Sequence, residues 1–431
     1  MKKLLNIINL YKRPGARAVG IYTFTNFFGK AASFLLLFVF TNPLYITPSE
    51  NGLLNLMSTS ILFLMPFVSM GTLHSISVDF FKLSPKEFRN HFTSGLVMPV
   101  IIVVLAYFLM YLLKGQLNTI YGIPASFVWI VPTIVFFSYI NEHLWNLLRN
   151  NNEPERFFKV TITQIILELG LSALLVVVFA WRWHGRVAGI LVAFGITTLY
   201  AFYYFKKKGY LFGNVKWSLL KNELYYAGPI VLMQGSIFCL GASDKFFLSG
   251  YTNDQNATLG IYSIAAIFAS VINIMGKSTL YHFFPKIFSQ LSTNDKDLRL
   301  VKRSFLQFIA IMIFFLLALI FLSPLAYHLF INEKYYSALN LIPLLSLGSF
   351  FWTVNYFFYA SMLYYKQKRK ILIISVFTIV ISLLINNFFI KNWESKGAAY
   401  GVCLSYFLVL LFSLWINRSF VKKVFSKPVS S

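Results

Sequence analysis

The chain of 431 residues is 58% hydrophobic and 19% aromatic but only 12% charged. Soluble domains are about 45–50% apolar, so this composition excludes a soluble globular protein and indicates a polytopic membrane protein. The net charge of +24 also suggests a nucleic-acid binder, but the basic residues are distributed as in a membrane protein, which argues against that class.

Apolar runs long enough to cross a bilayer recur along the chain from Ala18 to Asn417. A bilayer core of ~30 Å needs about 20 mostly apolar residues per helix. Only short polar segments separate the runs, so no soluble domain fits between them. We expect an all-α membrane protein with twelve transmembrane helices, at residues 18–41, 53–72, 92–113, 125–147, 158–180, 187–205, 228–248, 259–283, 303–327, 340–363, 371–390 and 398–417.

The N-terminal segment and the loops indicate how the helices are oriented. Met1–Arg13 interleaves leucine and isoleucine with lysine, which is typical of a helix lying on anionic lipid. The first apolar run is too long for a signal-peptide core and lacks a small-residue cleavage site, so we expect it to be retained. With the N-terminus inside, 29 of the 38 lysines and arginines fall in inward segments, six in outward loops and three within helices. This positive-inside bias predicts that both termini are cytoplasmic.

Two stretches that lie half a chain apart have matching residues at a constant offset. Asn51 corresponds to Asn256 and Met70-Gly71 to Met275-Gly276, each at an offset of 205 residues. Six helices per copy give both copies the same orientation, so we expect a parallel repeat, and such transporters bind substrate between the two lobes. The expected lobes are an N-terminal one that includes the interfacial helix and a C-terminal one that begins with a basic linker, residues 1–205 and 206–431.

Five of the expected helices carry polar residues along one side. At 100° per residue these side chains fall on one stripe of each helix. Hydroxyl and amide side chains often bridge neighbouring helices, which is the alternative to a functional role for any one of them. The stripes are Thr23, Asn26, Lys30 and Ser33; Thr161, Gln164, Glu168 and Ser172; Gln234, Asp244 and Lys245; Ser263, Ser270, Asn273, Lys277 and Tyr281; and Ser375, Thr378, Ser382 and Asn386.

Charges within these helices are the strongest site candidates, because a charge at the bilayer centre costs about 2.5–3.5 kcal/mol on the insertion scale. Lys30 and Glu168 lie near mid-depth, and a salt bridge between them is the alternative to a functional role. Lys277 lies nearer the cytoplasm, where its side chain can also reach the interface. Asp244 and Lys245 lie near the outer end of their helix, where pairing with each other and water is the alternative.

Catalytic motifs are absent from the sequence. Gly276-Lys277-Ser278 resembles the end of a phosphate-binding loop, but Val271 stands where the earlier glycine is required. The six histidines lack metal-ligand spacing, and Cys239 and Cys403 give no reason to infer a disulfide or a metal site. A membrane glycosyltransferase or polymerase needs a sizeable loop outside the bilayer, and the outward loops are short. We therefore expect no enzyme, no cofactor and no nucleic-acid partner.

Short motifs near both copies of the repeat carry a resemblance to a known family. They are Gly20-Ile21-Tyr22, Lys30–Leu37, Thr47-Pro48-x-Glu50-x-Gly52 and Gly71, with Asp244–Leu248 and Gly260–Ser263 in the second half. With these motifs in place, the chain resembles the bacterial polysaccharide exporters that flip lipid-linked oligosaccharides such as O-antigen units of lipopolysaccharide. They belong to the superfamily of the multidrug and toxin extrusion antiporters.

The resemblance implies two six-helix bundles around a central cavity in the bacterial cytoplasmic membrane. It implies an undecaprenyl-diphosphate-linked glycan as substrate, alternating access driven by a proton or sodium gradient, and membrane lipids and polysaccharide-assembly proteins as partners. A diphosphate needs fixed positive charge in a water-accessible cavity, which one lysine from each lobe would supply. We expect the substrate to be bound by Lys30, Lys277, Asn26, Asn273, Lys245 and Tyr281, and the ion to be coupled through Glu168 and Asp244.

An antiporter for small amphipathic cations is the alternative function. Its cavity would be dominantly acidic, whereas the charges within the helices here are Lys30, Lys245 and Lys277 against Glu168 and Asp244. This balance favours an anionic substrate. Neighbouring genes for glycosyltransferases and sugar-nucleotide enzymes would favour the flippase over the antiporter.

Overall fold

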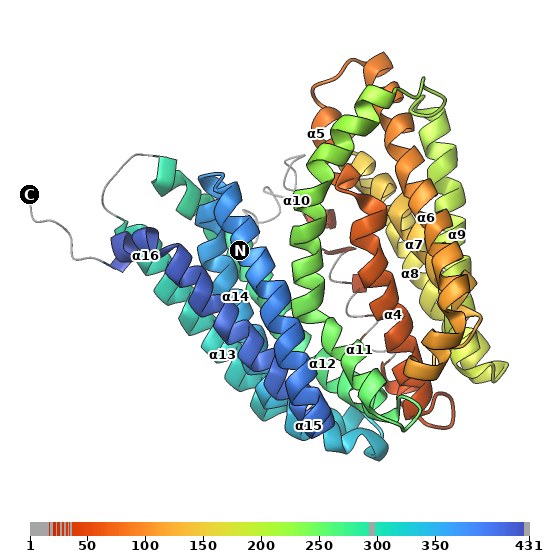
Figure 1. Cartoon of the computed structure of the whole chain (residues 1–431), viewed down its shortest axis with the longest axis vertical. Coiled ribbons are helices and arrows are strands. Elements are labelled where there is room, and N and C mark those ends of the chain that lie inside the picture. Colours follow the sequence, from red (N-terminus) through yellow and green to blue (C-terminus); the bar gives the residue numbers. More distant parts are fainter. Residues whose placement is uncertain are drawn as a thin grey trace, which may run out of the picture. The chain divides into compact units, whose positions relative to one another are not determined.

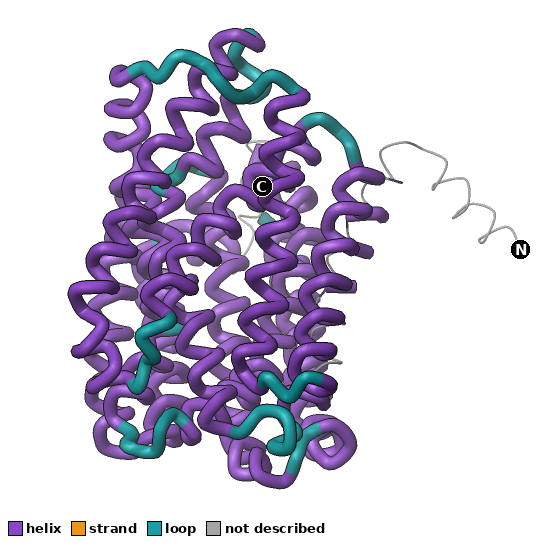
Figure 2. Tube along the Cα trace, turned by 90° about the vertical axis from the view of Figure 1, so that its right-hand side faces the viewer, coloured by secondary structure: helices purple, strands orange, loops and turns teal. Residues whose placement is uncertain are grey.

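The computed structural model describes residues 17, 20–22, 24, 25, 28, 29, 32, 34, 37–292 and 298–425. Within these ranges every regular element is helical (Figure 2), which confirms the all-α class predicted from the sequence. The expected interfacial helix lies outside the described residues, and so does much of the first expected span.

The chain forms two compact units (Figure 1). The first contains the residues up to Glu50 and Ser60–Val231, and the second contains Asn51–Thr59 and Leu232–Ser431. Because these boundaries fall within helices, α4 and α10 each run from one unit into the other. The elements are α3 (Leu37–Phe40), α4 (Pro48–Ser69), α5 (Thr72–Asp79), α6 (Pro85–Tyr121), α7 (Phe127–Asn150), α8 (Pro154–Ala173) with the π-helical turn η1 (Leu174–Val178), α9 (Arg182–Lys207), α10 (Trp217–Gly241), α11 (Ser243–Tyr251), α12 (Ala257–Ser292), α13 (Arg299–Phe330), the 3-10 helix η2 (Glu333–Leu341), α14 (Ile342–Tyr364), α15 (Lys368–Ile416) and α16 (Arg418–Phe425).

The described helices include nine that are long and apolar enough to cross a membrane, and α10 with α11, bent by 49°, makes a tenth when the pair is counted as one span. At 1.5 Å per residue, the 49 residues of α15 would extend roughly 74 Å, more than twice the bilayer core. Its backbone breaks at Glu394, with φ 47° and ψ −125°, and then folds back. A Cβ on Gly401 would lie only 3.0 Å from Asn386 Oδ1. The two arms of α15 are therefore the predicted helices 371–390 and 398–417.

Two helices begin earlier than the apolar pattern predicts, because each has a capping box. Thr47 Oγ1 accepts a hydrogen bond from the Glu50 N–H, while the Glu50 carboxylate accepts one from the Thr47 N–H at 2.8 Å. Ser84 and Glu87 form the same arrangement at the start of α6. Such boxes satisfy N–H groups that the first turn leaves unpaired. The polar segment expected to be a loop before residue 53 is thus in part the first turn of α4.

Local backbone geometry also interrupts two expected helices. Met70 and Gly71 take left-handed angles, φ 41° and 76°, which ends α4 and separates it from α5. Gly71 also packs closely, since a Cβ there would lie 2.6 Å from Ile230 Cδ1. Ala242, with φ −149°, separates α10 from α11 within the expected span 228–248. The sequence counterpart of the first break, Met275-Gly276, lies inside the unbroken α12.

Aromatic side chains fill much of the core of the second unit. Phe283, Phe308, Phe357 and Phe358, from α12, α13 and α14, are each at most 4% exposed. The ring centroids of Phe308 and Phe357 are 5.6 Å apart. The short helix α16, which the sequence analysis did not predict, packs on this core through its two buried apolar residues, Phe420 and Val424.

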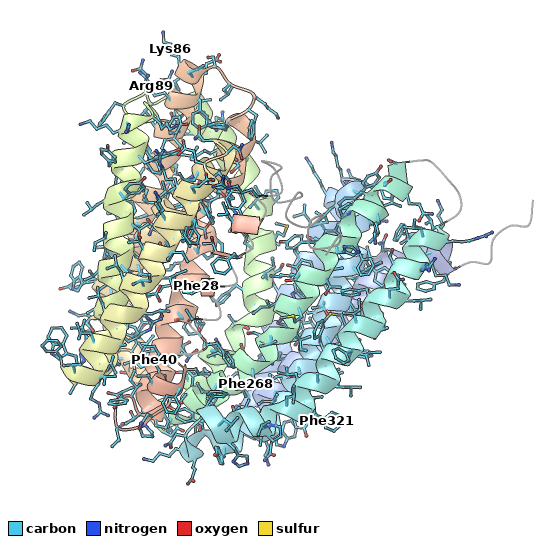
Figure 3. All side chains as sticks on the ribbon, turned by 180° about the vertical axis from the view of Figure 1, so that it is seen from behind. Phe28, Phe40, Lys86, Arg89, Phe268 and Phe321 are labelled. Carbon is cyan, nitrogen blue, oxygen red and sulfur yellow. The ribbon has the colours of Figure 1, made fainter. Side chains whose placement is uncertain are left out.

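The outward faces of several helices are apolar, as a membrane environment requires. Phe321 on α13 is 76% exposed, whereas Phe268 on α12 is buried (Figure 3). In the first unit, Lys86 and Arg89 lie at one end and Phe40 lies toward the other (Figure 3). The positive-inside rule predicts that the end with Lys86 and Arg89 is cytoplasmic. The chain is a multi-pass membrane protein with many apolar helices.

Candidate functional site

Three of the predicted site residues, Asp244, Lys245 and Asn273, line one pocket in the second unit. The pocket has a volume of about 210 Å³ and lies among α11, α12, α14 and the second arm of α15. The structure therefore brings together residues that lie on two different predicted stripes. The other polar lining residues are Tyr262, Ser263, Ser270, Ser349 and Tyr406.

Asp244 is placed by the break between α10 and α11, because the break makes it part of the first turn of α11. A helix N-terminus favours a carboxylate electrostatically. Asp244 is only 3% exposed, and its Oδ2 accepts a hydrogen bond from the Tyr262 hydroxyl at 2.5 Å. The next residue, Lys245, interacts electrostatically with it and lines the same pocket. The pair is thus held in a polar interior rather than at a water-facing helix end.

Three oxygen atoms around this pocket lack a side-chain hydrogen-bond donor. They are Asp244 Oδ1, Ser263 Oγ and Asn273 Oδ1, all of them buried. The amide of Asn273 donates to Ser349 Oγ at 3.2 Å, which fixes the orientation of that side chain. Such oxygens can accept hydrogen bonds from water or coordinate a small cation. The part of the chain that the structure describes has no group of three or more His, Cys, Asp or Glu side chains that could hold a metal ion.

A second polar cluster lies beside Asp244, where α11 meets α15. Asn386 is 1% exposed, and its amide donates to Ser243 Oγ at 3.1 Å. Asn386 Oδ1 and Ser405 Oγ are buried and have no hydrogen-bond partner within the described part of the chain. Asn386 lies on the stripe predicted for the first arm of α15, and the whole stripe from Ser375 to Asn386 is buried. The stripe therefore faces the interior of the second unit.

Two predicted substrate-binding residues of α12, Lys277 and Tyr281, do not line this pocket. They follow Asn273 by one and two helical turns. The Lys277 side chain is exposed, with its Nζ 5.6 Å from the centroid of the Tyr356 ring, and Tyr281 is 73% exposed. The remaining two predicted residues, Asn26 and Lys30, lie outside the described residues.

The other predicted coupling residue, Glu168, forms an ion pair with Arg186 in the first unit. Glu168 Oε1 lies 2.8 Å from Arg186 Nη2, and both side chains are about one-fifth exposed. Arg186 Nη1 also donates to Ser172 Oγ at 3.0 Å. The sequence analysis placed Arg186 in an outward loop and named Lys30 as the ion-pair alternative. Arg186 instead lies in the second turn of α9, because α9 begins at Arg182 rather than residue 187.

Glycines hold α8, η1 and α9 close enough for this ion pair. A Cβ on Gly189 would lie 2.7 Å from the Ser172 nitrogen, and one on Gly185 would lie 2.9 Å from the Leu175 carbonyl carbon. Small residues allow close backbone approach between membrane helices. The hairpin geometry thus places Arg186 opposite Glu168.

Sequence analysis missed the pocket residues Ser349 and Tyr406, which α14 and α15 contribute. Their helices are apolar on average, and neither residue lies on a stripe that was detected. Tyr262 was not among the predicted site residues either, although its hydroxyl donates the hydrogen bond to Asp244.

Solved structures of transporters have the same fold. A multidrug resistance MATE family transporter of the MOP superfamily, in an inward-facing conformation, matches with a TM-score of 0.68 and 16% identity, over 91% of this chain and 96% of that chain. The lipid II flippase MurJ, in an inward closed conformation, matches with 0.72 and 13% identity, over 94% and 89%. The Vibrio cholerae MATE transporter VcmN in its bent form matches with 0.58 and 15% identity, over 95% and 98%. The chain is therefore a helical membrane protein with the MATE and MurJ type of fold.

The sequence itself matches a family model. The model described as polysaccharide biosynthesis protein matches residues 45–340, more than half of the chain. The chain belongs to this polysaccharide biosynthesis protein family, which confirms the resemblance found in the sequence. No curated protein matches it.

Proposed function

We propose that the chain flips undecaprenyl-diphosphate-linked oligosaccharides across the bacterial cytoplasmic membrane for surface polysaccharide synthesis. One observation carries the proposal: a member of a polysaccharide biosynthesis family has the fold of a lipid II flippase. Alternating access exposes the bound substrate to each side of the membrane in turn. The protein is a transporter in this proposal, not an enzyme, and both termini are cytoplasmic.

Fixed positive charge recognises the diphosphate in this proposal. Lys30 and Lys277 supply that charge, and Lys245, Asn26, Asn273 and Tyr281 complete the set of substrate-binding residues. The exposed position of Lys277 on α12 supports its role, because a phosphate oxygen can approach an exposed ammonium. A Lys30→Ala protein that inserts normally yet restores full surface polysaccharide in a flippase-null strain would remove Lys30 from the mechanism.

The buried pair of Asp244 and Lys245 couples transport to an ion gradient. A proton or sodium ion on Asp244 neutralises a carboxylate that Tyr262 and Lys245 otherwise stabilise. A ligand shifts a conformational equilibrium only by its difference in affinity for the two states. The ion therefore favours the state in which the pocket binds it better. Glu168 is the second coupling residue, and its neutralisation would release Arg186.

Proteoliposomes test the proposal directly. Purified protein is reconstituted with a defined undecaprenyl-diphosphate-linked oligosaccharide, and translocation is measured with no gradient, with a proton gradient and with a sodium gradient. Translocation should depend on the protein and should accelerate with one of the gradients. No movement of the lipid, together with export of a cationic dye, would overturn the proposal.

A multidrug antiporter is the second candidate, because MATE transporters share the fold. It would need an acidic cavity for cationic substrates. Within the helix bounds expected from the sequence, Lys30, Lys245 and Lys277 stand against Glu168 and Asp244, and this balance favours the anionic substrate. Dye export from the same proteoliposomes separates the two functions.

A further inference from the structure

A second pocket lies within the second unit, and it shares no lining residue with the Asp244 pocket. It has a volume of about 220 Å³ and lies among α10, α14 and both arms of α15. We call it the aromatic pocket. Its defining residues are Trp352, Asn355, Tyr356 and Tyr359 of α14 and Ser375 and Thr378 of α15.

The aromatic rings of this pocket come from one helix. Trp352, Tyr356 and Tyr359 are separated by four and three residues, so they lie along one face of α14. The ring centroids of Trp352 and Tyr356 are 4.9 Å apart at an interplanar angle of 81°, and those of Tyr356 and Tyr359 are 6.4 Å apart. Rings in different planes line a concave surface rather than stacking on one another. The C–H face of a sugar ring can pack on such rings while its hydroxyls point elsewhere.

Polar side chains also line the aromatic pocket. Asn355 is only 2% exposed, and its Oδ1 has no hydrogen-bond partner among the residues that the structure describes. Ser375 and Thr378, each 3% exposed, bring hydroxyl groups from α15. An unpaired buried acceptor is destabilising, and a sugar hydroxyl that donates a hydrogen bond to it would remove that cost. An isoprenoid chain has no donor and would leave Asn355 unpaired, so the lining favours a saccharide over a lipid tail.

The side chain of Lys277, which is cationic, lies beside this pocket. Lys277 Nζ lies 5.6 Å from the centroid of Tyr356, and Lys277 is the residue of α12 proposed above to meet the diphosphate. In a lipid-linked oligosaccharide the first sugar is bonded directly to the diphosphate. A diphosphate at Lys277 therefore brings that sugar beside Tyr356.

We propose that the aromatic pocket is a saccharide subsite for the first sugar of the lipid-linked oligosaccharide, the one joined to the diphosphate. Trp352, Tyr356 and Tyr359 pack on the ring, and Asn355 and Thr378 hydrogen-bond its hydroxyls. This assignment rests on the proposed flippase function and adds to it a site that selects the glycan.

Binding measurements on two lipids test the subsite. The probes are undecaprenyl-diphosphate-linked oligosaccharides extracted from the cells in which the protein occurs, and undecaprenyl diphosphate without sugar. Asn355→Leu, of nearly equal volume, should weaken binding of the glycosylated lipid about tenfold, which corresponds to about 1.4 kcal/mol. The affinity for undecaprenyl diphosphate should stay unchanged. Tyr364→Leu is the matched control, since Tyr364 lies on the same helix but stacks on Phe288.

The thermal stability of the variant shows whether it is folded, and the two affinities then separate a binding role from a structural one. Asn355→Leu removes an unpaired acceptor, so a purely structural Asn355 predicts unchanged or higher stability and no change in either affinity. If Asn355→Leu does not fold, Thr378→Val makes the same test at the facing hydroxyl.

Three results would overturn the inference. Unchanged affinity of both variants for the glycosylated lipid, with wild-type protein binding both lipids, removes the subsite and leaves the flippase function standing. Equal losses for the two lipids place the isoprenoid or the diphosphate in the pocket instead of the sugar. Wild-type protein that binds neither lipid overturns the flippase function itself, and the subsite with it.

Discussion

Asp244 is a carboxylate buried in a membrane helix, and its neighbours explain how the fold accommodates it. Burial of an unpaired charge costs several kcal/mol, so buried charges are paired or hydrogen-bonded. Here the Tyr262 hydroxyl, the adjacent Lys245 and the N-terminal end of α11 all favour the charged form. The carboxylate nevertheless keeps one oxygen without a side-chain donor. In the proposed mechanism, that oxygen receives the coupling ion.

Replacing Asp244 by asparagine should uncouple transport from the gradient. The side chain keeps its shape but loses the charge that attracts a proton or sodium ion. We expect gradient-driven translocation in proteoliposomes to fall by about 5–150-fold, the range of typical coupling energies, with little change in the gradient-free rate. Asp254→Asn, at an exposed carboxylate, is the control and should behave like the wild type. Full gradient dependence in Asp244→Asn would contradict the coupling role.

The ion pair of Glu168 with Arg186 should contribute measurably to stability. Glu168→Gln leaves Arg186 uncompensated in a mostly buried position, so the free energy of unfolding should fall, by less than the about 3–5 kcal/mol known for fully buried pairs. The double variant with Arg186→Gln should recover part of that loss, since it leaves no unpaired charge. Thermal unfolding in detergent measures both changes.

The more exposed pair of Glu50 with Arg182 provides the comparison. The Arg182 side chain is 49% exposed, and pairs at such positions contribute about 0–1 kcal/mol. Glu50→Gln should therefore lower the unfolding temperature less than Glu168→Gln does. A larger effect at Glu50 would show that burial does not set the strength of these pairs.

At the scale of helices, close contacts and backbone breaks position the charged side chains. Glycines allow α9 to pack closely against α8 and η1, and this packing places Arg186 beside Glu168. The break at Ala242 turns α11 away from α10 and places Asp244 in a helix N-terminal turn. Both features change the direction or spacing of a helix without changing its apolar character.

Two glycine substitutions should have opposite effects on stability. A methyl group on Gly189 meets the Ser172 backbone, so Gly189→Ala should cost about 1–3 kcal/mol through overpacking. Gly170→Ala, on α8 with nothing within 4 Å of the new Cβ, should stabilise the helix by up to about 1 kcal/mol. Unfolding temperatures in one detergent measure the two effects. If Gly189→Ala raised the unfolding temperature instead, α8 and α9 would be able to move apart without a loss of stability.

At the scale of the whole molecule, the charge distribution predicts the orientation in the membrane. Both native cysteines are first replaced by alanine, and a single cysteine is then introduced at Lys86 or at Lys368. A membrane-impermeant maleimide that is added outside intact spheroplasts should not react with either cysteine. A cysteine at Lys334 should react. The physical reason is the excess of basic residues in the inward segments. Labelling of the cysteine at Lys86 but not of the one at Lys334 would show that the orientation is opposite to the one predicted.

The repeat also has a structural counterpart within the second unit. Asn51 and Asn256, which correspond in sequence, lie close together there: a Cβ on Gly52 would lie 2.8 Å from Asn256 Cβ. Asn51 donates to the Tyr335 hydroxyl at 2.5 Å, while Asn256 accepts from Ser249. Each of the two equivalent asparagines is thus held by a side-chain hydrogen bond within the second unit.

The sequence by itself determined the membrane class, the approximate spans and the family. Each of these follows from local properties: about 20 apolar residues cross a bilayer wherever they occur, and short motifs can be compared directly. The same local signal was less reliable at helix ends. The starts of α4 and α6 depend on capping boxes whose residues are polar, so a hydropathy pattern passes over them.

Only the tertiary structure decided which polar residues meet. A helical stripe gives the side of a helix that is polar, but not which other helix faces that side. Glu168 therefore meets Arg186, which the sequence analysis had assigned to a loop, and the Asp244 pocket is completed by Ser349 and Tyr406 from distant helices. Such contacts depend on helix bends and on glycine-mediated packing, and neither has a periodic signature in the sequence.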